Sequence, residues 1–222
     1  MKDIEEKINK YFIERNKKWW TNPGKGKRVI DSYIKILPKD LRDRIHAGGM
    51  NVLDIGSGPH QFLLRMREFG NEIFAVDKYP KDDPVEAIGS GGYFSINLAY
   101  KYLAEKYSIK YKGDGAFGSY GENFGFNKKF DLINIRDAYK FLEAIELKGD
   151  DDKLIDKFLV DSIRSLSGSG YLVIRTTKKR CRKILKRFVQ LRFIEGDGGH
   201  TVFLKKGAYL NNIRFKDGVI KL

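Results

Sequence analysis

The sequence predicts an α/β protein with a doubly wound, mostly parallel sheet and an N-terminal helical extension. Two observations carry this prediction. From residue 51 onward, short apolar runs alternate with helical patterns, and strands separated by helices form a parallel sheet covered on both faces. The turn Gly56-Ser57-Gly58 follows the first run, where glycine lets the backbone turn tightly and lets a ligand approach closely.

Three helical segments are expected before the first strand. Residues 3–19 carry a helical apolar stripe, and "WWTNPGKGKR" at 19–28 is expected to break it with one proline and two glycines. A second helix then runs to Pro38, and a short third helix covers 39–46. The positions expected on the apolar side of the second helix are Val29, Ile30, Tyr33, Ile34 and Leu37.

The remaining elements alternate along the chain. Strands are expected at 51–55, 72–76, 109–112, 130–135, 170–176 and 200–206, and helices at 60–69, 96–107, 151–166 and 178–190. The glycine-aromatic segment 113–129 is either a mobile lid or a loop folded over the sheet edge. The expected organisation is a helical extension or lid at 1–46, a catalytic domain at 47–206 and a C-terminal tail at 207–222.

The composition is that of a globular chain. Of the 222 residues, 41% are hydrophobic and 32% are charged, and no apolar run approaches the ~18–20 residues of a membrane span. The segment "MKDIEEKINKYF" lacks the apolar centre of a signal peptide. The lone cysteine, Cys181, excludes an internal disulfide and disfavours a cysteine-built zinc site. We therefore expect a cytoplasmic protein with neither a membrane span nor a metal site.

The charge of the chain favours a polyanionic partner. The formal net charge is +14, and such a field attracts polyanions and speeds their encounter with the protein. The basic segment "KKRCRKILKR" at 178–187 is expected to form a helix with Cys181, Ile184, Leu185 and Phe188 facing inward. Its basic face could follow a phosphate backbone or could simply be solvated. A nucleic acid is the favoured partner, and scattered surface lysines are the alternative.

Two carboxylates lie at one edge of the predicted sheet. The first strand ends at Asp54 and the second ends next to Asp77, and ligands of open parallel sheets bind beyond such carboxyl ends. A carboxylate at Asp77 can accept hydrogen bonds from both ribose hydroxyls. Gln61 stands where a dinucleotide motif has its third glycine, and Asp54 would repel a pyrophosphate. S-adenosylmethionine, with an ammonium, a sulfonium and no phosphate, suits this edge better.

The segment "VLDIGSGPH" resembles motif I of class I S-adenosylmethionine-dependent methyltransferases, D/E-x-G-x-G-x-G, and departs from it at His60, which is expected at a helix start. "AVDKY", "YKGDG", "FDLINIRDAYKFLE" and "SGSGYLVIRTT" are similar to the family's later motifs, in order. The resemblance covers about residues 47–206 and implies a Rossmann-like domain of about seven strands. It implies cofactor contacts from Asp54, Gly56, Ser57, Gly58, His60, Asp77, Lys78, Asp114, Gly115, Asn134 and Arg136. Asp77 and Asp114 also fit ordinary loop and turn residues.

The acceptor site of this family lies past its fourth strand. Asp137 is the candidate for a polar acceptor contact or a base, and helix capping is the alternative. The signatures of adenine-amino and covalent cytosine methylation do not occur there, and the ribose-methylation tetrad is not cleanly placed, although Arg175 stands near one of its lysines. Predicted substrate contacts, which combine stacking surface with basic groups, are Trp19, Trp20, Lys25, Lys27 and Arg28. The tryptophans could instead anchor the first helix.

The function that these features favour is methyl transfer from S-adenosylmethionine to RNA. A small-molecule or protein acceptor is the first alternative. A non-catalytic nucleic-acid-binding module with the same fold is the second, and a nicotinamide oxidoreductase is the third. The acceptor atom and the oligomeric state stay open at the level of sequence.

Overall fold

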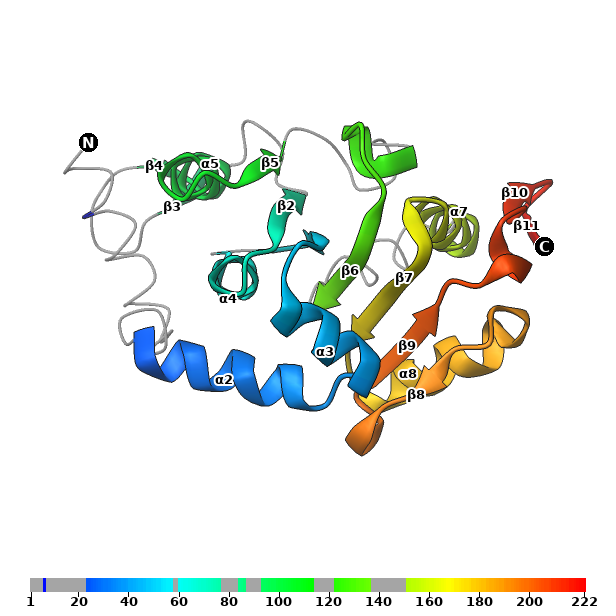
Figure 1. The fold of residues 1–222 in the computed structure, drawn as a ribbon. Coiled ribbons are helices and arrows are strands. Elements are labelled where there is room, and N and C mark those ends of the chain that lie inside the picture. The colour runs from blue at the N-terminus through cyan, green and yellow to red at the C-terminus, as the bar shows by residue number, and fades with distance from the viewer. Residues whose placement is uncertain are drawn as a thin grey trace.

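The computed structural model describes residues 6, 23–57, 60–76, 84–86, 93–113, 122–136 and 151–222. A seven-stranded sheet in the order β5-β2-β1-β6-β7-β9-β8 forms its centre (Figure 1). The strands are β1 (Asn51–Ile55), β2 (Glu72–Val76), β5 (Lys110–Lys112), β6 (Phe130–Arg136), β7 (Leu166–Arg175), β8 (Ile194–Glu195) and β9 (Thr201–Lys205). The pairs from β5 to β7 are parallel, whereas β9 is antiparallel to both β7 and β8. The predicted doubly wound, mostly parallel sheet is confirmed.

Six α-helices surround this sheet in the described part of the chain. They are α2 (Pro23–Lys35), α3 (Lys39–Ala47), α4 (Gln61–Glu68), α5 (Ile96–Lys106), α7 (Asp151–Arg164) and α8 (Lys178–Arg187). Strand β3 (Pro84–Glu86) pairs antiparallel with β4 (Tyr93–Ser95), and β10 (Arg214–Lys216) forms a hairpin with β11 (Val219–Lys221). The 3₁₀ segments are η2 (Glu122–Gly125), η3 (Val189–Leu191), η4 (Asp197–Gly199) and η5 (Ala208–Leu210). No described helix is long and apolar enough to cross a membrane.

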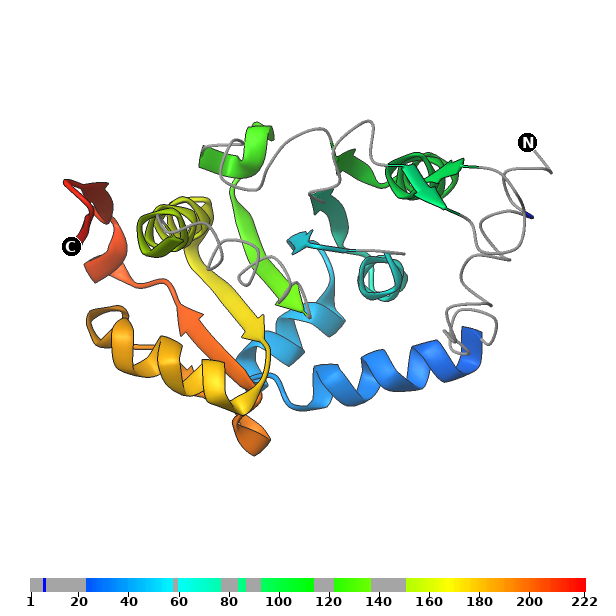
Figure 2. The ribbon, with the colours of Figure 1, turned by 180° about the vertical axis from the view of Figure 1, so that it is seen from behind.

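The two faces of the sheet carry separate hydrophobic cores because successive residues of a strand point to opposite faces. Leu53 and Ile55 join the core formed with α7 and α8, which we call the α7-side core. Val52 joins the core formed with α2, α3, α4 and α5, which we call the α2-side core. Asp54 therefore points toward the α2 side. In both views α2 lies beyond the arrowheads of β6 and β7 (Figures 1 and 2).

The structure corrects the prediction for the segment before the first strand. The expected break at 19–28 is wrong for residues 23–28, because α2 begins at Pro23 and continues through Gly24 and Gly26. Proline is favoured in a first helical turn, where its missing N–H costs nothing. Burial of the apolar stripe offsets the roughly 1 kcal/mol that each glycine costs in a helix. The buried residues of that stripe are Ile30, Tyr33, Ile34 and Leu37.

Val29 is the other correction in α2. It was expected on the buried side, but it is 50% exposed. The fully buried positions Ile30, Tyr33, Ile34 and Leu37 already form a complete helical stripe, and Val29 lies beside that stripe rather than in it. The inward face predicted for α8 is correct, because Cys181, Ile184 and Phe188 are buried and Leu185 packs against the same core.

Part of the glycine-aromatic segment, whose alternatives were open, and the residues predicted as a C-terminal tail both contribute to the α7-side core. In 122–128, Phe124 is buried against Phe158, and the Phe126 ring lies 5.1 Å from the ring of Phe74. This part of the loop therefore covers the sheet edge, and residues 114–121 lie outside the described part. Residues 207–222 contribute buried side chains to the α7-side core through Leu210, Ile213 and Ile220. Their hairpin contacts α7.

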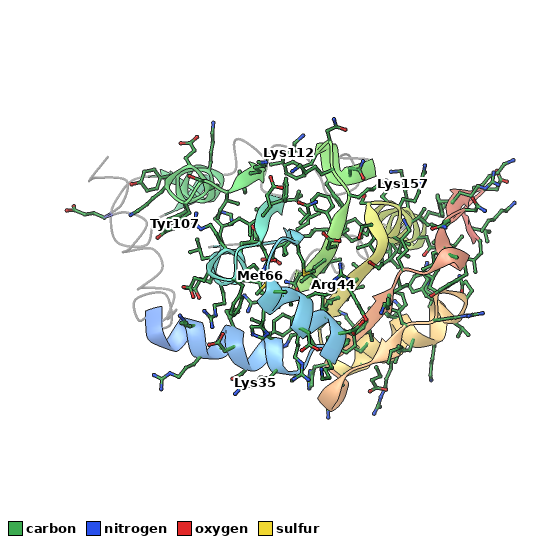
Figure 3. All side chains as sticks on the ribbon, in the orientation of Figure 1. Lys35, Arg44, Met66, Tyr107, Lys112 and Lys157 are labelled. Carbon is green, nitrogen blue, oxygen red and sulfur yellow. The ribbon has the colours of Figure 1, made fainter. Side chains whose placement is uncertain are left out.

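Helix α3 is attached to the amino ends of the strands by charged side chains. Arg44, labelled in Figure 3, donates to Asp131 Oδ1 at 3.1 Å and to the Ser169 carbonyl at 2.8 Å. Asp131 also accepts from the Asn51 backbone N–H and from the Ser167 hydroxyl. Each of these contacts pairs a donor with an acceptor, so the amino end of the sheet is held by satisfied polar groups.

Candidate functional site

The candidate site lies at the carboxyl ends of β1, β2, β6 and β7. In a parallel sheet these ends share one edge, and ligands bind there. Gly56 directly follows β1 with a φ of +70°, a conformation that glycine adopts without a Cβ clash. Its N–H donates to the Val76 carbonyl at 2.8 Å. This bond holds the glycine turn against the end of β2, immediately before Asp77 in the sequence.

Ser57 and His60 connect the turn to helix α4. The Ser57 hydroxyl and His60 Nδ1 are 2.9 Å apart, and His60 is fully buried directly before the first residue of α4. The expected helix-start position of His60 is therefore correct. Its φ is +61°, a left-handed conformation that is uncommon for residues other than glycine. This conformation explains why motif I has glycine at the position where this chain departs from it.

A chain of three buried side chains joins α2 to the ends of β1 and β6. Tyr33 Oη donates to Asn134 Oδ1 at 2.6 Å, and Asn134 Nδ2 donates to Asp54 Oδ1 at 2.6 Å. Asp54 and Asn134 are register partners in the β1–β6 pair, so both point to the α2 side. Tyr33 is 1% exposed, Asp54 2% and Asn134 0%. The three residues lie 101 and 80 positions apart in sequence and meet only through the fold.

The orientation of the Asn134 amide follows from Asp54. An ionised carboxylate only accepts hydrogen bonds, so the amide must turn its NH₂ toward Asp54. The amide oxygen then faces Tyr33, whose hydroxyl must donate. A buried carboxylate is costly unless it is hydrogen-bonded. The network therefore holds the Asp54 carboxyl group in a fixed place beneath the glycine turn.

Strands β6 and β7 each end at an arginine beside this network. Arg136 and Arg175 are register partners, and their guanidinium carbons lie 5.9 Å and 5.3 Å from the centroid of the Tyr33 ring. Within the described ranges, neither guanidinium has a carboxylate partner. The Tyr33 ring therefore lies between a network centred on Asp54 and a pair of positive charges.

A pocket opens between α2 and the end of β7. Its volume is about 340 Å³, and its walls are Arg28, Val29, Ser32, Tyr33, Ile36 and Arg175. This volume is at the lower end of the range of small-ligand sites, roughly 300–1,000 Å³. The exposed Val29 contributes an apolar wall, whereas Arg28 and Arg175 contribute positive charge. The pocket thus combines an aromatic ring, a basic rim and an apolar surface.

The structure brings together part of the predicted site. Asp54, Gly56, Ser57, His60, Asn134 and Arg136 gather at the carboxyl edge, and Arg28 lines the pocket. Lys27 instead pairs with Glu68 of α4 at 3.0 Å, and both side chains are about half exposed. Lys25 belongs to α2, although its side chain lies outside the described part. Also outside it are Trp19, Trp20, Gly58, Asp77, Lys78, Asp114, Gly115 and Asp137.

Sequence reasoning gave no polar role to Tyr33, which it placed only on an apolar stripe. A usable signal exists, because a buried tyrosine among aliphatic residues needs a partner for its hydroxyl.

No group of three or more histidine, cysteine, aspartate or glutamate side chains in the described ranges could hold a metal ion.

No protein-family model and no curated protein sequence matches the chain. Solved structures do match it. The N-methyltransferase NodS from Bradyrhizobium japonicum WM9 has 13% sequence identity and a TM-score of 0.52, with 84% of this chain and 98% of that chain covered. The TehB-like SAM-dependent methyltransferase from Corynebacterium glutamicum ATCC 13032 Kitasato has 16% identity and a TM-score of 0.50, with 87% and 97% covered.

A third structure is the SAM-bound amino pentose methyltransferase CalS10 from Micromonospora echinaspora. It has 16% identity, with 61% of this chain covered, and the match spans only 48% of its own length. Its TM-score is 0.40. The likeness to the first two structures shows the fold. The chain has the fold of class I S-adenosylmethionine-dependent methyltransferases, as the sequence motifs predicted.

Proposed function

We propose that this chain is an S-adenosylmethionine-dependent methyltransferase that acts on RNA. The observation that carries the proposal is the buried Asp54 carboxylate beneath the Gly56 turn, at the ligand-binding edge of a methyltransferase fold. The residues present fit this cofactor, because a fixed negative charge suits a ligand with an ammonium and a sulfonium. The nearby turn leaves the backbone open to close approach.

The roles that we propose for the site residues follow the order of the strands. Asp54, Gly56, Ser57 and His60 would hold the cofactor on the β1 side, and Asp77 would hold its ribose. When bound, S-adenosylmethionine supplies an electrophilic methyl group on a positively charged sulfur. The protein then needs chiefly to align the acceptor with that methyl group, which is catalysis by positioning. Helix α2 covers the acceptor side and restricts the entry of water over Asn134.

The RNA acceptor is supported by charge. The chain carries a net charge of +14, and exposed basic residues occur on α2 and α8. Single-stranded nucleic acid is held by basic grooves combined with aromatic stacking surfaces. A small-molecule acceptor is the second candidate, because the pocket beneath α2 holds only about 340 Å³. We place the protein in the cytoplasm as part of the same proposal, since its lone cysteine, Cys181, suits a reducing compartment.

Calorimetric titration with S-adenosylmethionine tests the cofactor. We expect binding by the wild-type chain and a loss of about tenfold or more in Asp77→Ala, because a hydrogen-bonded carboxylate contributes roughly 1.5–3 kcal/mol. Asp217→Ala, which removes a carboxylate from the turn between β10 and β11, is the matched control. Normal affinity in Asp77→Ala would contradict the proposed site. Incubation with radiolabelled cofactor and separate RNA, protein and metabolite pools then identifies the acceptor class, and label confined to metabolites would favour the second candidate.

A further inference from the structure

The pairing of Arg136 with Arg175 is unfavourable by itself. Neighbouring strands lie about 4.8 Å apart, so register partners on parallel strands hold their side chains close together. Like charges at directly opposed positions destabilise a sheet. Arg136 and Arg175 occupy such positions at the last register pair of β6 and β7. Both guanidinium groups lie near the Tyr33 ring, so two positive charges share one side of the sheet at this edge.

The described part of the protein supplies only partial compensation. The Tyr33 ring accepts both cations on its π system, at 5.9 Å for Arg136 and 5.3 Å for Arg175. The Tyr33 hydroxyl is already committed to Asn134. Some arginines have carboxylate partners, since Arg65 pairs with Asp31 at 2.7 Å and Arg187 with Asp156 at 3.0 Å. Arg136 and Arg175 instead lie against one aromatic ring at the carboxyl edge.

The position of the pair separates it from the cofactor side. The glycine turn follows β1 and is bonded to β2, whereas β7 lies two strands away from β1 in the opposite direction. Arg175 lines the pocket under α2, together with Arg28. Guanidinium groups bind phosphate through paired N–H donors, and a phosphate between two of them neutralises both. The pocket is therefore basic, partly enclosed and adjacent to the acceptor side.

We infer that Arg136 and Arg175 form a phosphate subsite for the acceptor, roofed by α2 and set against the Tyr33 ring. This inference rests on the proposed function, because it assigns the phosphate to the backbone of the RNA acceptor. A phosphodiester held there would place the adjoining nucleotide toward the cofactor side of the same edge. The same chemistry could also hold the phosphomonoester of a small molecule, and the experiment separates these two sources.

Three variants test the subsite by fluorescence anisotropy with a labelled oligoribonucleotide that carries hydroxyl groups at both ends. We expect Arg175→Gln and Arg136→Gln to weaken binding about tenfold each. Arg214→Gln removes one charge from an exposed position of β10 and should change affinity less than about twofold. Each subsite variant should also lower the slope of log affinity against log salt by about 0.7. An equal loss in Arg214→Gln and Arg175→Gln would overturn the inference, because it would reduce the effect to overall charge.

A second measurement tests the subsite without RNA. It compares the shift in melting temperature that a ligand causes in each protein, so the variants' own stabilities do not enter. Inorganic phosphate should raise the melting temperature of the wild type more than that of Arg175→Gln, with Arg214→Gln behaving as wild type. An equal shift in all three proteins would contradict the subsite. If the binding of a nucleoside 5′-monophosphate depends on Arg175 while the binding of the oligoribonucleotide does not, the phosphate does not come from RNA. Failure of the proposed function is seen separately, as absence of S-adenosylmethionine binding by the wild type.

Discussion

The two ends of the central sheet hold their polar groups in opposite ways. At the amino end, Asp131 accepts from Arg44, from a serine hydroxyl and from a backbone N–H, and Asp40 of α3 accepts from Tyr171 and Lys205, both at 2.6 Å. At the carboxyl end, one carboxylate is deeply buried and two arginines are register partners on neighbouring strands. The first arrangement is complete within the described protein. In the second, Arg136 and Arg175 have no carboxylate partner within the described ranges, which fits the phosphate subsite proposed above.

The pKa values at the amino end agree with a purely structural role. The hydrogen bond from Lys205, followed by that from Tyr171, lowers the pKa of Asp40 below its usual value. Burial and the bond to Asp40 raise the pKa of Tyr171, and Asp40 also raises the pKa of Lys205. Each shift favours the protonation state already present near neutrality. This cluster therefore holds its charges fixed instead of exchanging protons.

The largest effect is expected from Asn134→Leu. This change removes the hydrogen bonds that Asn134 makes to the buried Asp54 carboxylate and to the buried Tyr33 hydroxyl, and losing these two bonds should cost about 2–4 kcal/mol. Urea unfolding should show a loss within that range. A loss below about 1 kcal/mol would mean that the network does not stabilise the carboxyl end, and the contrast between the two ends would fail.

A matched pair of tyrosine variants sharpens the same contrast. Tyr33→Phe removes one hydrogen bond and leaves the Asn134 oxygen buried, so the free energy of unfolding should fall by about 1–3 kcal/mol. Tyr171→Phe removes a bond to the half-exposed Asp40, which water can replace, so the loss should be about 0.5–1 kcal/mol. Equal losses in the two variants, measured by urea unfolding, would show that burial does not distinguish the ends.

The sequence predicted the strands and the glycine turn because local patterns specify them. The β1 and β2 bounds agree with the apolar runs at 51–55 and 72–76, and the parallel order follows from the alternation with helices. Helix α2 was mispredicted at its start, because residue preferences at Pro23 and Gly26 were outweighed by the packing of the stripe that follows. Local propensity is a weak guide where tertiary burial is large.

The site was predicted less completely because its contacts depend on register. The Asp54–Asn134 bond requires a particular alignment of β1 with β6, which lie about 80 residues apart in the chain. The facing of Arg136 and Arg175 also depends on an irregularity near the start of the β6–β7 pair, which shifts the alignment of all later residues. A one-residue difference would turn one arginine to the other face. No pattern within a single strand contains that information.

The smallest effect is expected from Asp40→Asn at the amino end. Because the Asp40 and Lys205 side chains are each about half exposed, solvent screens their attraction, and the loss should not exceed about 1 kcal/mol near neutral pH. The lowered pKa of Asp40 means that its contribution is present above the unfolded value of 3.8 and is lost as the pH falls through the lower folded value. The difference between wild type and Asp40→Asn should therefore vanish in acid and shrink at about 1 M salt. A difference that grows in acid, or that is insensitive to salt, would show that Asp40 acts through packing. The amino end would then not be held by paired charges.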